Sequence, residues 1–220
     1  MNKLILILVG PPGSGKGTQA LEISKLYNIP HISTGDMFRY HLKNLTDIGL
    51  EAKAYIDKGL LVPDTVTNKM VWARIQEKDC NNGFLLDGFP RNLMQADFFD
   101  KLLKDLKIRL NAVLYINVKD EVIVNRLSGR RVCNQCGYIS HIDSMMVKGI
   151  LLKTCNKCGG TFIQRVDDQI DVILDRLKVY HEQTKPIIAH YQKQKLVNEI
   201  DGDMEQTKVF KSIVEVINSR

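Results

Sequence analysis

The residues with the clearest chemical potential lie in one glycine-rich stretch, GPPGSGKGTQ at positions 10–19, which follows the apolar run LILILV. Its glycines let the backbone curl so that several N–H groups point inward, and a helix starting there adds its positive end. Lys16 can then reach the terminal phosphates of a nucleotide, as the lysine of a P-loop does. A glycine-rich turn without a ligand is the alternative, which the lysine and the position after a strand argue against.

The hydroxyl group of this stretch is displaced by one residue. A P-loop has Ser or Thr directly after the lysine, where the hydroxyl binds Mg²⁺, whereas here Gly17 stands in that place and Thr18 follows. We therefore expect Mg²⁺ to be held mainly by phosphate oxygens and by water molecules that a carboxylate orients.

A second group of chemically useful residues is DGFPRN at positions 87–92. Asp87 follows an apolar run and can orient the water around Mg²⁺, Gly88 allows another group to approach closely, and Arg91 can donate two hydrogen bonds to one phosphate. Glycine and proline are also common in turns that bind nothing. The presence of a P-loop in the same chain favours the functional interpretation.

Arginines gather on both sides of an irregular region: Arg126, Arg130 and Arg131 precede it, and Arg165 and Arg176 follow it, with Asp167 and Asp168 close by. Phosphoryl transfer needs positive donors on the transferring oxygens more than it needs acids or bases. Closure of a mobile insertion can deliver such arginines. Each arginine alone is more often a surface charge, but the group, together with a P-loop in the same chain, favours a functional role.

Two Cys-x-x-Cys pairs lie inside that irregular region, at Cys133 and Cys136 and at Cys155 and Cys158. Their spacing is typical of a zinc ribbon, in which four thiolates surround one ion and leave no open position, so the metal is expected to be structural. Disulfides and an iron–sulfur centre are the alternatives. Cys80 has no partner of this kind in the sequence.

The elements that must position these residues alternate between short apolar runs and helical patterns. Strands are predicted at 4–9, 30–33, 83–86, 112–117 and 196–201, and helices at 15–27, 34–43, 47–58, from 63 to near 80, and at 167–194. Thr34-Gly35-Asp36 is expected to cap the second of these helices. The last helix contains Pro186, which should kink or break it. This alternation predicts an α/β fold with a parallel sheet covered on both faces, whose ligands bind beyond the carboxyl ends of the strands.

The bulk properties are compatible with this picture. The chain has 220 residues, which suits one domain with insertions, or two domains at most. Its net charge of +6 and pI of about 9.0 suit an anionic ligand, whether nucleic acid, membrane or nucleotide. The first apolar run is short and is interrupted by Pro11-Pro12-Gly13, so a buried strand explains it better than a signal peptide. A cytoplasmic protein is expected.

Five motifs taken together resemble the adenylate kinase family, in its bacterial form with a long zinc-carrying lid: GPPGSGKGTQA, ISTGDMFR, GFLLDGFPR, RLSGRRVC and QRVDDQ. The match is collinear over essentially the whole chain. The resemblance implies a P-loop fold with a five-stranded parallel sheet in a core formed by 1–32, 63–128 and 169–220. It also implies a helical AMP-binding segment at 33–62 and a zinc-ribbon-like lid at 129–168.

The resemblance also implies the individual contacts. ATP is assigned to Gly13, Ser14, Gly15, Lys16, Gly17, Thr18, Arg126, Ile139, Ser140 and Met204. AMP is assigned to Thr34, Arg39, Leu60, Leu61, Val62, Gly88, Phe89, Pro90, Arg91, Gln95, Arg165 and Arg176. The catalytic set is Lys16, Asp87, Arg91, Arg130, Arg165 and Arg176.

The implied reaction is in-line phosphoryl transfer from Mg·ATP to AMP, giving two ADP, by a monomer that uses structural Zn²⁺ and binds neither nucleic acid nor membrane. Three alternatives share parts of the pattern. A UMP/CMP-type kinase has the same core but commonly a short lid. A noncatalytic nucleotide switch needs no second arginine-lined site, and a nucleic-acid-binding zinc ribbon wants more aromatic residues than Tyr138 and Phe162 provide.

Overall fold

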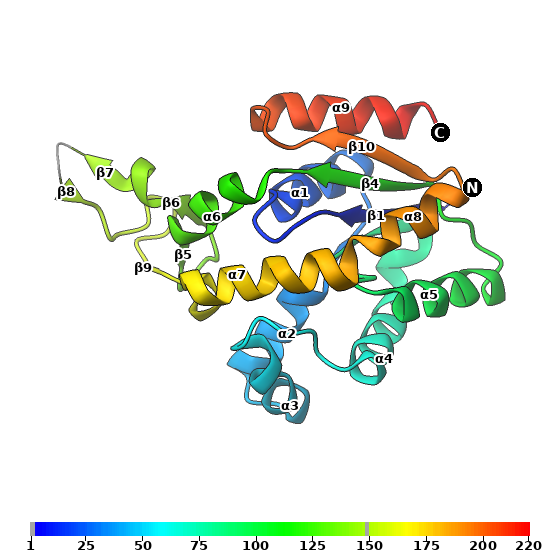
Figure 1. Ribbon diagram of the computed structural model, residues 1–220, viewed down its shortest axis with the longest axis horizontal. Coiled ribbons are helices and arrows are strands. Elements are labelled where there is room, and N and C mark those ends of the chain that lie inside the picture. Colours follow the sequence, from blue (N-terminus) through cyan, green and yellow to red (C-terminus); the bar gives the residue numbers. More distant parts are fainter. Residues whose placement is uncertain (1–2, 148–149) are drawn as a thin grey trace.

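The computed structural model describes residues 3–147 and 150–220 and is built around a parallel sheet (Figure 1). In this part of the chain the sheet has five strands, in the order β10-β4-β1-β3-β2. Their bounds are β1 Leu4–Val9, β2 His31–Ser33, β3 Gly83–Asp87, β4 Ala112–Asn117 and β10 Val197–Asp201. The predicted α/β fold with a five-stranded parallel sheet is confirmed.

The strands are apolar because helices cover both faces of the sheet. Along β1, Ile5, Ile7 and Val9 face one core cluster while Leu6 and Leu8 face the other. The first cluster is completed by α4 Asp64–Ile75, α5 Leu93–Asp105 and α8 Pro186–Lys193, and the second by α1 Lys16–Tyr27, α6 Asp120–Ser128, α7 Ile170–Val179 and α9 Gln206–Asn218. Side chains that alternate between two buried faces produce a near-continuous hydrophobic run in each strand.

Two further helices, α2 Thr34–Lys43 and α3 Asp47–Ile56, lie beneath the sheet in Figure 1. The cap of α2 is Ser33 and not the predicted Thr34. The Ser33 hydroxyl accepts a hydrogen bond from the Asp36 N–H. The two helices pack around a small cluster that includes Phe38 and Ala52. Since Ser33 serves as the cap, the Thr34 side chain is available for the site.

The region between α6 and α7 extends away from the core (Figure 1). It contains an antiparallel sheet in the order β6-β5-β9 and the separate hairpin β7-β8. The strands are β5 Arg130–Cys133, β6 Ile139–His141, β7 Met146–Val147, β8 Ile150–Leu151 and β9 Phe162–Ile163, with 3₁₀ turns at Ile142–Met145 and Val166–Asp168. The predicted segments 1–32 and 129–168 include residues 1–2 and 148–149, which lie outside the described residues.

The predicted long helix at 167–194 starts later and does not break at its proline. After α7, a π turn at Tyr180–Thr184 leads directly into α8, with Lys185 N–H donating to the Tyr180 carbonyl at 2.8 Å. Proline lacks an N–H and its ring clashes with the carbonyl four residues earlier. The wider turn accommodates Pro186, so that α8 follows α7 without a loop between them. The predicted helix from 63 to near 80 is also divided, into α4 and a 3₁₀ turn at Lys78–Asn82.

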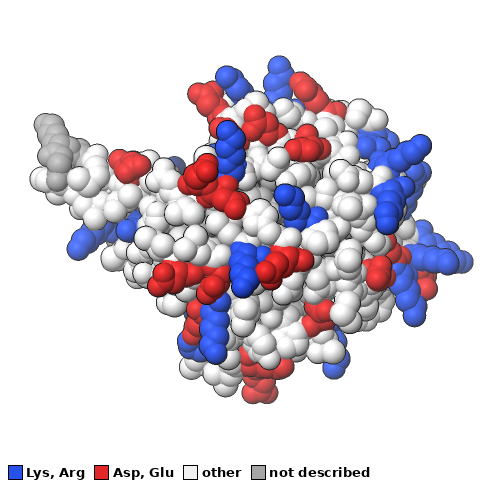
Figure 2. All heavy atoms as spheres, in the orientation of Figure 1, with Lys and Arg blue, Asp and Glu red and all other residues white. Residues whose placement is uncertain are grey.

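The surface charge is uneven on the face drawn in Figure 2. Basic side chains gather at the end of the molecule where the chain termini lie, away from the Cys-containing region, whereas acidic and basic groups are mixed over the middle. Within the described residues, none of the helices is long and apolar enough to cross a membrane.

Candidate functional site

The glycine-rich stretch forms the loop between β1 and α1, at the carboxyl end of the central strand of the sheet. Gly15 precedes the helix with a φ of 91°, a left-handed conformation that favours glycine. Gly10 passes so close to β4 that a Cβ there would lie 2.5 Å from the Ile116 carbonyl oxygen. The predicted P-loop geometry therefore follows from glycines that are needed for conformation and for space.

The Lys16 ammonium group folds back over its own loop. Its Nζ donates to the carbonyls of Gly10 and Pro11, both at 2.7 Å, and more weakly to the Ser14 hydroxyl at 3.3 Å. Burial lowers the pKa of Lys16 from 10.5 to about 8, with nearby arginines, Arg91 first, adding to the effect and the Asp87 carboxylate opposing it. A phosphate group placed in the loop would relieve this repulsion.

Asp87 ends β3, next to the P-loop strand. Its Oδ2 lies 3.2 Å from the His31 Nε2 and 3.7 Å from where a Cβ on Gly17 would stand. Glycine at position 17 thus keeps the start of α1 close to a carboxylate. This donor set, one carboxylate beside the glycine-rich loop and no hydroxyl directly after the lysine, fits Mg²⁺ held through water and phosphate oxygens.

The DGFPRN turn is tied to its surroundings by its own polar groups. The Gly88 carbonyl accepts from the Thr34 hydroxyl at 2.7 Å and from the Arg91 Nε at 2.9 Å. Gly88 has a φ of 76°, and a Cβ there would lie 2.8 Å from the Arg91 Nη2. The backbone N–H of Arg91 donates to the Gln95 Oε1, and its carbonyl accepts from the Thr184 hydroxyl, both at 2.8 Å.

Six basic side chains from separate parts of the chain influence one another in this region: Lys16, Arg39, Arg91, Arg130, Arg165 and Arg176. Burial, followed by repulsion from other arginines, lowers the pKa of Arg91 to about 10 and that of Arg165 to about 10. Burial also lowers the pKa of Arg176, which Asp167 partly offsets. A region in which cations repel one another without enough carboxylates is suited to a polyanion.

Two aspartates hold the arginines on either side of the Cys-containing region. Arg130 donates to both carboxylate oxygens of the fully buried Asp168, at 2.8 and 2.5 Å. Arg176 donates to the Asp167 carbonyl at 2.7 Å and lies 2.8 Å from that residue's carboxylate. Burial alone would raise the pKa of Asp167, but the charges of Arg176, Arg130 and Arg165, with Arg176 having the largest effect of the three, hold it below its ordinary value.

Other predicted contact residues lie around the edges of this cluster. Arg126 donates to the Gly202 carbonyl at 3.0 Å, which ties α6 to the turn that carries Met204, whose side chain packs against the second core cluster. Ile139 and Ser140 lie on β6, outside the central sheet. Val62 and Phe89 are buried, whereas Leu60 is exposed. Arg131, in contrast to Arg130, donates to neighbouring backbone carbonyls.

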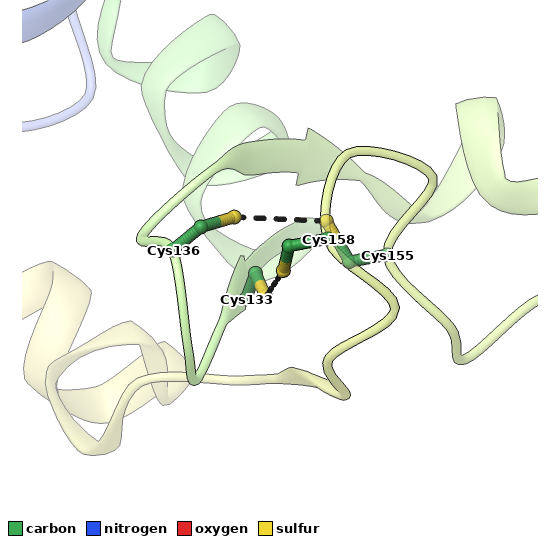
Figure 3. A group of neighbouring side chains, drawn as sticks. All are labelled: Cys133, Cys136, Cys155 and Cys158. Atoms are coloured by element: carbon green, nitrogen blue, oxygen red, sulfur yellow. Dashed lines mark hydrogen bonds between the residues drawn. The ribbon is translucent and has the colours of Figure 1, made fainter.

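The side chains of the four paired cysteines converge at the carboxyl end of β5 (Figure 3). All four sulfurs lie within 4.8 Å of one another, with 3.4 Å between Cys133 and Cys158 and 3.8 Å between Cys136 and Cys155. Four thiolates at about 2.3 Å from one tetrahedral zinc would be about 3.8 Å apart. The Lys157 N–H also donates to the Cys155 sulfur at 3.4 Å. The residues therefore fit a structural Zn²⁺ better than two disulfides.

Comparison with known proteins gives one consistent result. The sequence model of the family described as "Adenylate kinase" matches residues 8–196. The chain is 49% identical to an adenylate kinase of Thermoanaerobacter sp. (strain X514) over 215 residues, which cover 98% of both chains. It is 48% identical to the adenylate kinase of Acholeplasma laidlawii over 218 residues, 99% of this chain and all of the relative.

The chain belongs to the adenylate kinase family. As an adenylate kinase, the enzyme converts ATP and AMP to two molecules of ADP. Its family membership decides against a noncatalytic nucleotide switch and favours AMP over UMP or CMP as the acceptor. The Cys cluster is consistent with the zinc-binding long form that the sequence resembles.

Several residues that shape the site of this adenylate kinase were not predicted from the sequence. His31 contacts Asp87, and Asp64 accepts hydrogen bonds from Asn92 and Gln95. The sequence marks Asp64 only as the start of a helix after Pro63, and His31 only as part of a short strand. Their contacts arise between elements far apart in the chain, so no local pattern identifies them.

Proposed function

We propose that the enzyme binds ATP phosphates in the P-loop and the AMP phosphate at the DGFPRN turn, with the arginines between them neutralising the transferring group. The supporting observation is the set of mutually repelling basic side chains around the carboxyl ends of β1 and β3. A P-loop accounts for the phosphates of one nucleotide only. The additional half-buried cations at Arg91, Arg165 and Arg176 are explained by a second phosphorylated substrate.

In this mechanism an oxygen of the AMP phosphate forms a bond to the γ-phosphorus of ATP, in line with the bond to the β–γ bridging oxygen, which breaks as ADP leaves. Lys16, Arg91, Arg130, Arg165 and Arg176 stabilise the charge on the transferring oxygens. Mg²⁺ supplies further neutralisation of the phosphates when bound, and Asp87 would orient its water. The AMP phosphate is already ionised, so no general base is needed.

The nucleoside parts are assigned to the surrounding segments. Thr34, Arg39, Leu60–Val62, Gly88–Arg91 and Gln95 would contact AMP, with the base near the buried Val62 and Gln95. Gly13–Thr18 would hold the ATP phosphates, and Arg126, Ile139, Ser140 and Met204 would surround the ATP base. The bond from Arg126 to the Gly202 carbonyl supports this last assignment, because it ties α6 to the turn next to Met204.

We further propose that 33–62 and 129–168 move relative to the core formed by 1–32, 63–128 and 169–220. Closure of 129–168 would bring Arg130 and Arg165 to the phosphates and exclude water, which otherwise hydrolyses ATP. A bound Zn²⁺ would keep that segment folded, since only Cys133, Met145 and Cys155 are buried hydrophobic side chains among its described residues. All these groups come from one chain, which supports function as a monomer.

Steady-state kinetics with each substrate varied separately test the assignment of the two phosphate sites. Arg39→Ala and Arg91→Ala should raise KM for AMP about tenfold or more with a much smaller effect on KM for ATP, because each removes a charged phosphate contact. Lys16→Met should lower kcat on the order of a hundredfold while ATP still binds. An increase confined to KM for ATP in the two arginine variants would mean that the sites are reversed.

A further inference from the structure

A closed ring of hydrogen bonds joins the start of α4 to the start of α5. The Asp64 Oδ1 accepts from the Gln95 Nε2 at 2.6 Å and from the Asn92 Nδ2 at 2.9 Å. The Asn92 Oδ1 accepts from the Gln95 backbone N–H at 2.8 Å, and the Gln95 Oε1 accepts from the Arg91 backbone N–H at 2.8 Å. The Asp64 carboxylate is the charged member of this ring.

This ring fixes which way round the Gln95 amide lies. A carboxylate can only accept hydrogen bonds and a backbone N–H can only donate one, so the amide nitrogen must face Asp64 and the oxygen must face Arg91. A flipped amide would place its oxygen against the carboxylate and its NH₂ group against an N–H. Two hydrogen bonds would be lost and replaced by two repulsive contacts, in a side chain that is only 1% exposed.

The fixed amide has one donor and one acceptor left. A carboxamide has two N–H groups and an oxygen with two lone pairs. The ring of hydrogen bonds uses one N–H and one lone pair, which leaves the other N–H and the other lone pair free to bind a ligand. Adenine presents an amino donor at C6 beside an acceptor at N1, which a carboxamide edge can match. Hypoxanthine and guanine present the reverse, a carbonyl acceptor at C6 beside an N–H at N1, and would need the flipped amide.

We propose that Asp64 is a positioning residue that holds Gln95 in the orientation that accepts adenine and rejects purines with a carbonyl at C6. This inference rests on the proposed function, in which Gln95 faces the AMP base. Because Gln95 is buried, the base reaches it only as the surrounding side chains part. The contact is then made without intervening water, where a mismatched donor or acceptor has the largest effect on affinity.

The sharpest test compares AMP with inosine monophosphate as phosphoryl acceptors. Inosine monophosphate has an acceptor at C6 and a donor at N1, the reverse of AMP, and unlike guanosine monophosphate it carries no additional amino group. Asp64→Ala removes the acceptor and should lower the ratio of kcat/KM for AMP to kcat/KM for inosine monophosphate by about tenfold or more. Asp64→Asn keeps an oxygen that can accept the same bonds and should retain most of the preference. KM for ATP should change less than twofold in both variants.

Asp171→Ala is the matched control. Asp171, like Asp64, is an aspartate in the first turn of a helix, but it lies in α7 and its side chain is exposed. It should leave the ratio unchanged. If Asp64→Ala does not fold, Asp64→Ser supplies the same measurement, because its side chain is too short to reach the Gln95 amide. Equal losses with both acceptors, leaving the ratio at its parent value, would overturn the proposal.

Gln95→Ala separates this inference from the proposed function. If that variant keeps the parent ratio, Gln95 does not read the base, and the assignment of the AMP base site is wrong. If Gln95→Ala collapses the ratio while Asp64→Ala does not, the base site stands and only the positioning role of Asp64 is refuted.

Discussion

The pKa of Lys16 gives a quantitative prediction about the use of ATP at alkaline pH. Burial lowers this pKa from 10.5 to about 8, which corresponds to about 3 kcal/mol of preference against the charged form. In the free enzyme the ammonium group is therefore charged below pH 8 and loses its proton as the pH rises through that value. Since only the charged form can pair with a phosphate, kcat/KM for ATP should be level near pH 7 and fall above pH 8.

The expected size of the fall follows from simple titration. One unit above the pKa about a tenth of the enzyme carries the charge, so kcat/KM for ATP should decrease about tenfold per pH unit between pH 8.5 and 10. A coupled assay at saturating AMP and Mg²⁺ over pH 6.5–10 measures this decrease, the alkaline limb of the pH profile. Lys16→Arg is the matched variant, because the ordinary pKa of a guanidinium group lies about two units above that of an ammonium group, so the decrease should begin at higher pH.

Two outcomes would refute the reasoning. One is an alkaline limb that stays at the same pH in Lys16→Arg, because the limb would then arise from the titration of a group other than Lys16. The other comes from Asp87→Asn, which removes the carboxylate that raises the pKa of Lys16. That variant should move the limb to lower pH whatever its absolute activity, and a limb that stays at pH 8 or moves upward would show that the environment of Lys16 is wrongly understood.

Two further predictions concern stability. Cys133→Ser should abolish binding of a full equivalent of zinc and lower the melting temperature while leaving residual phosphoryl transfer, as metal analysis, a melting curve and an activity assay would show; full zinc content with the parent melting temperature would contradict a structural site. Gly10→Ala should lower the free energy of unfolding by about 1–3 kcal/mol in denaturant titration, because its Cβ would meet the Ile116 carbonyl oxygen at 2.5 Å. Gly137→Ala is the comparison variant. Gly137 also has a positive φ, but a Cβ there has open space, so its loss of stability measures the backbone strain without a steric clash.

The local structure of the glycine-rich loop and of the DGFPRN turn could be predicted from sequence because each is continuous in the chain. In the glycine-rich loop, the glycines, the lysine and the preceding apolar strand are neighbours, so their types and order specify the geometry. The same holds for the cysteine pairs, whose short spacing is set by the knuckle around a metal. The parallel sheet follows from apolar runs without alternation, since strands covered on both faces have no polar side.

Two local predictions were inexact because tertiary contacts decided between similar alternatives. Ser33 and Thr34 are both good helix caps, and Ser33 takes that role while Thr34 bonds to the Gly88 carbonyl. Pro186 was expected to kink or break a helix; the helical turns do not break but continue through a π turn, on which the Thr184 hydroxyl donates to the Arg91 carbonyl. In both cases the deciding partner lies more than fifty residues away.

The sequence by itself determined the P-loop, the DGFPRN turn, the cysteine centre and the order of strands and helices along the chain, because these depend on neighbouring residues and on hydrophobic periodicity. Only the tertiary structure decided that Asp168 would hold Arg130, that His31 would lie against Asp87, and that Asp64 would orient the amide of Gln95. The physical reason is that a hydrogen bond is specified by position and direction in space. Separations of 31 to 56 residues in the chain leave no periodicity from which such a meeting can be predicted.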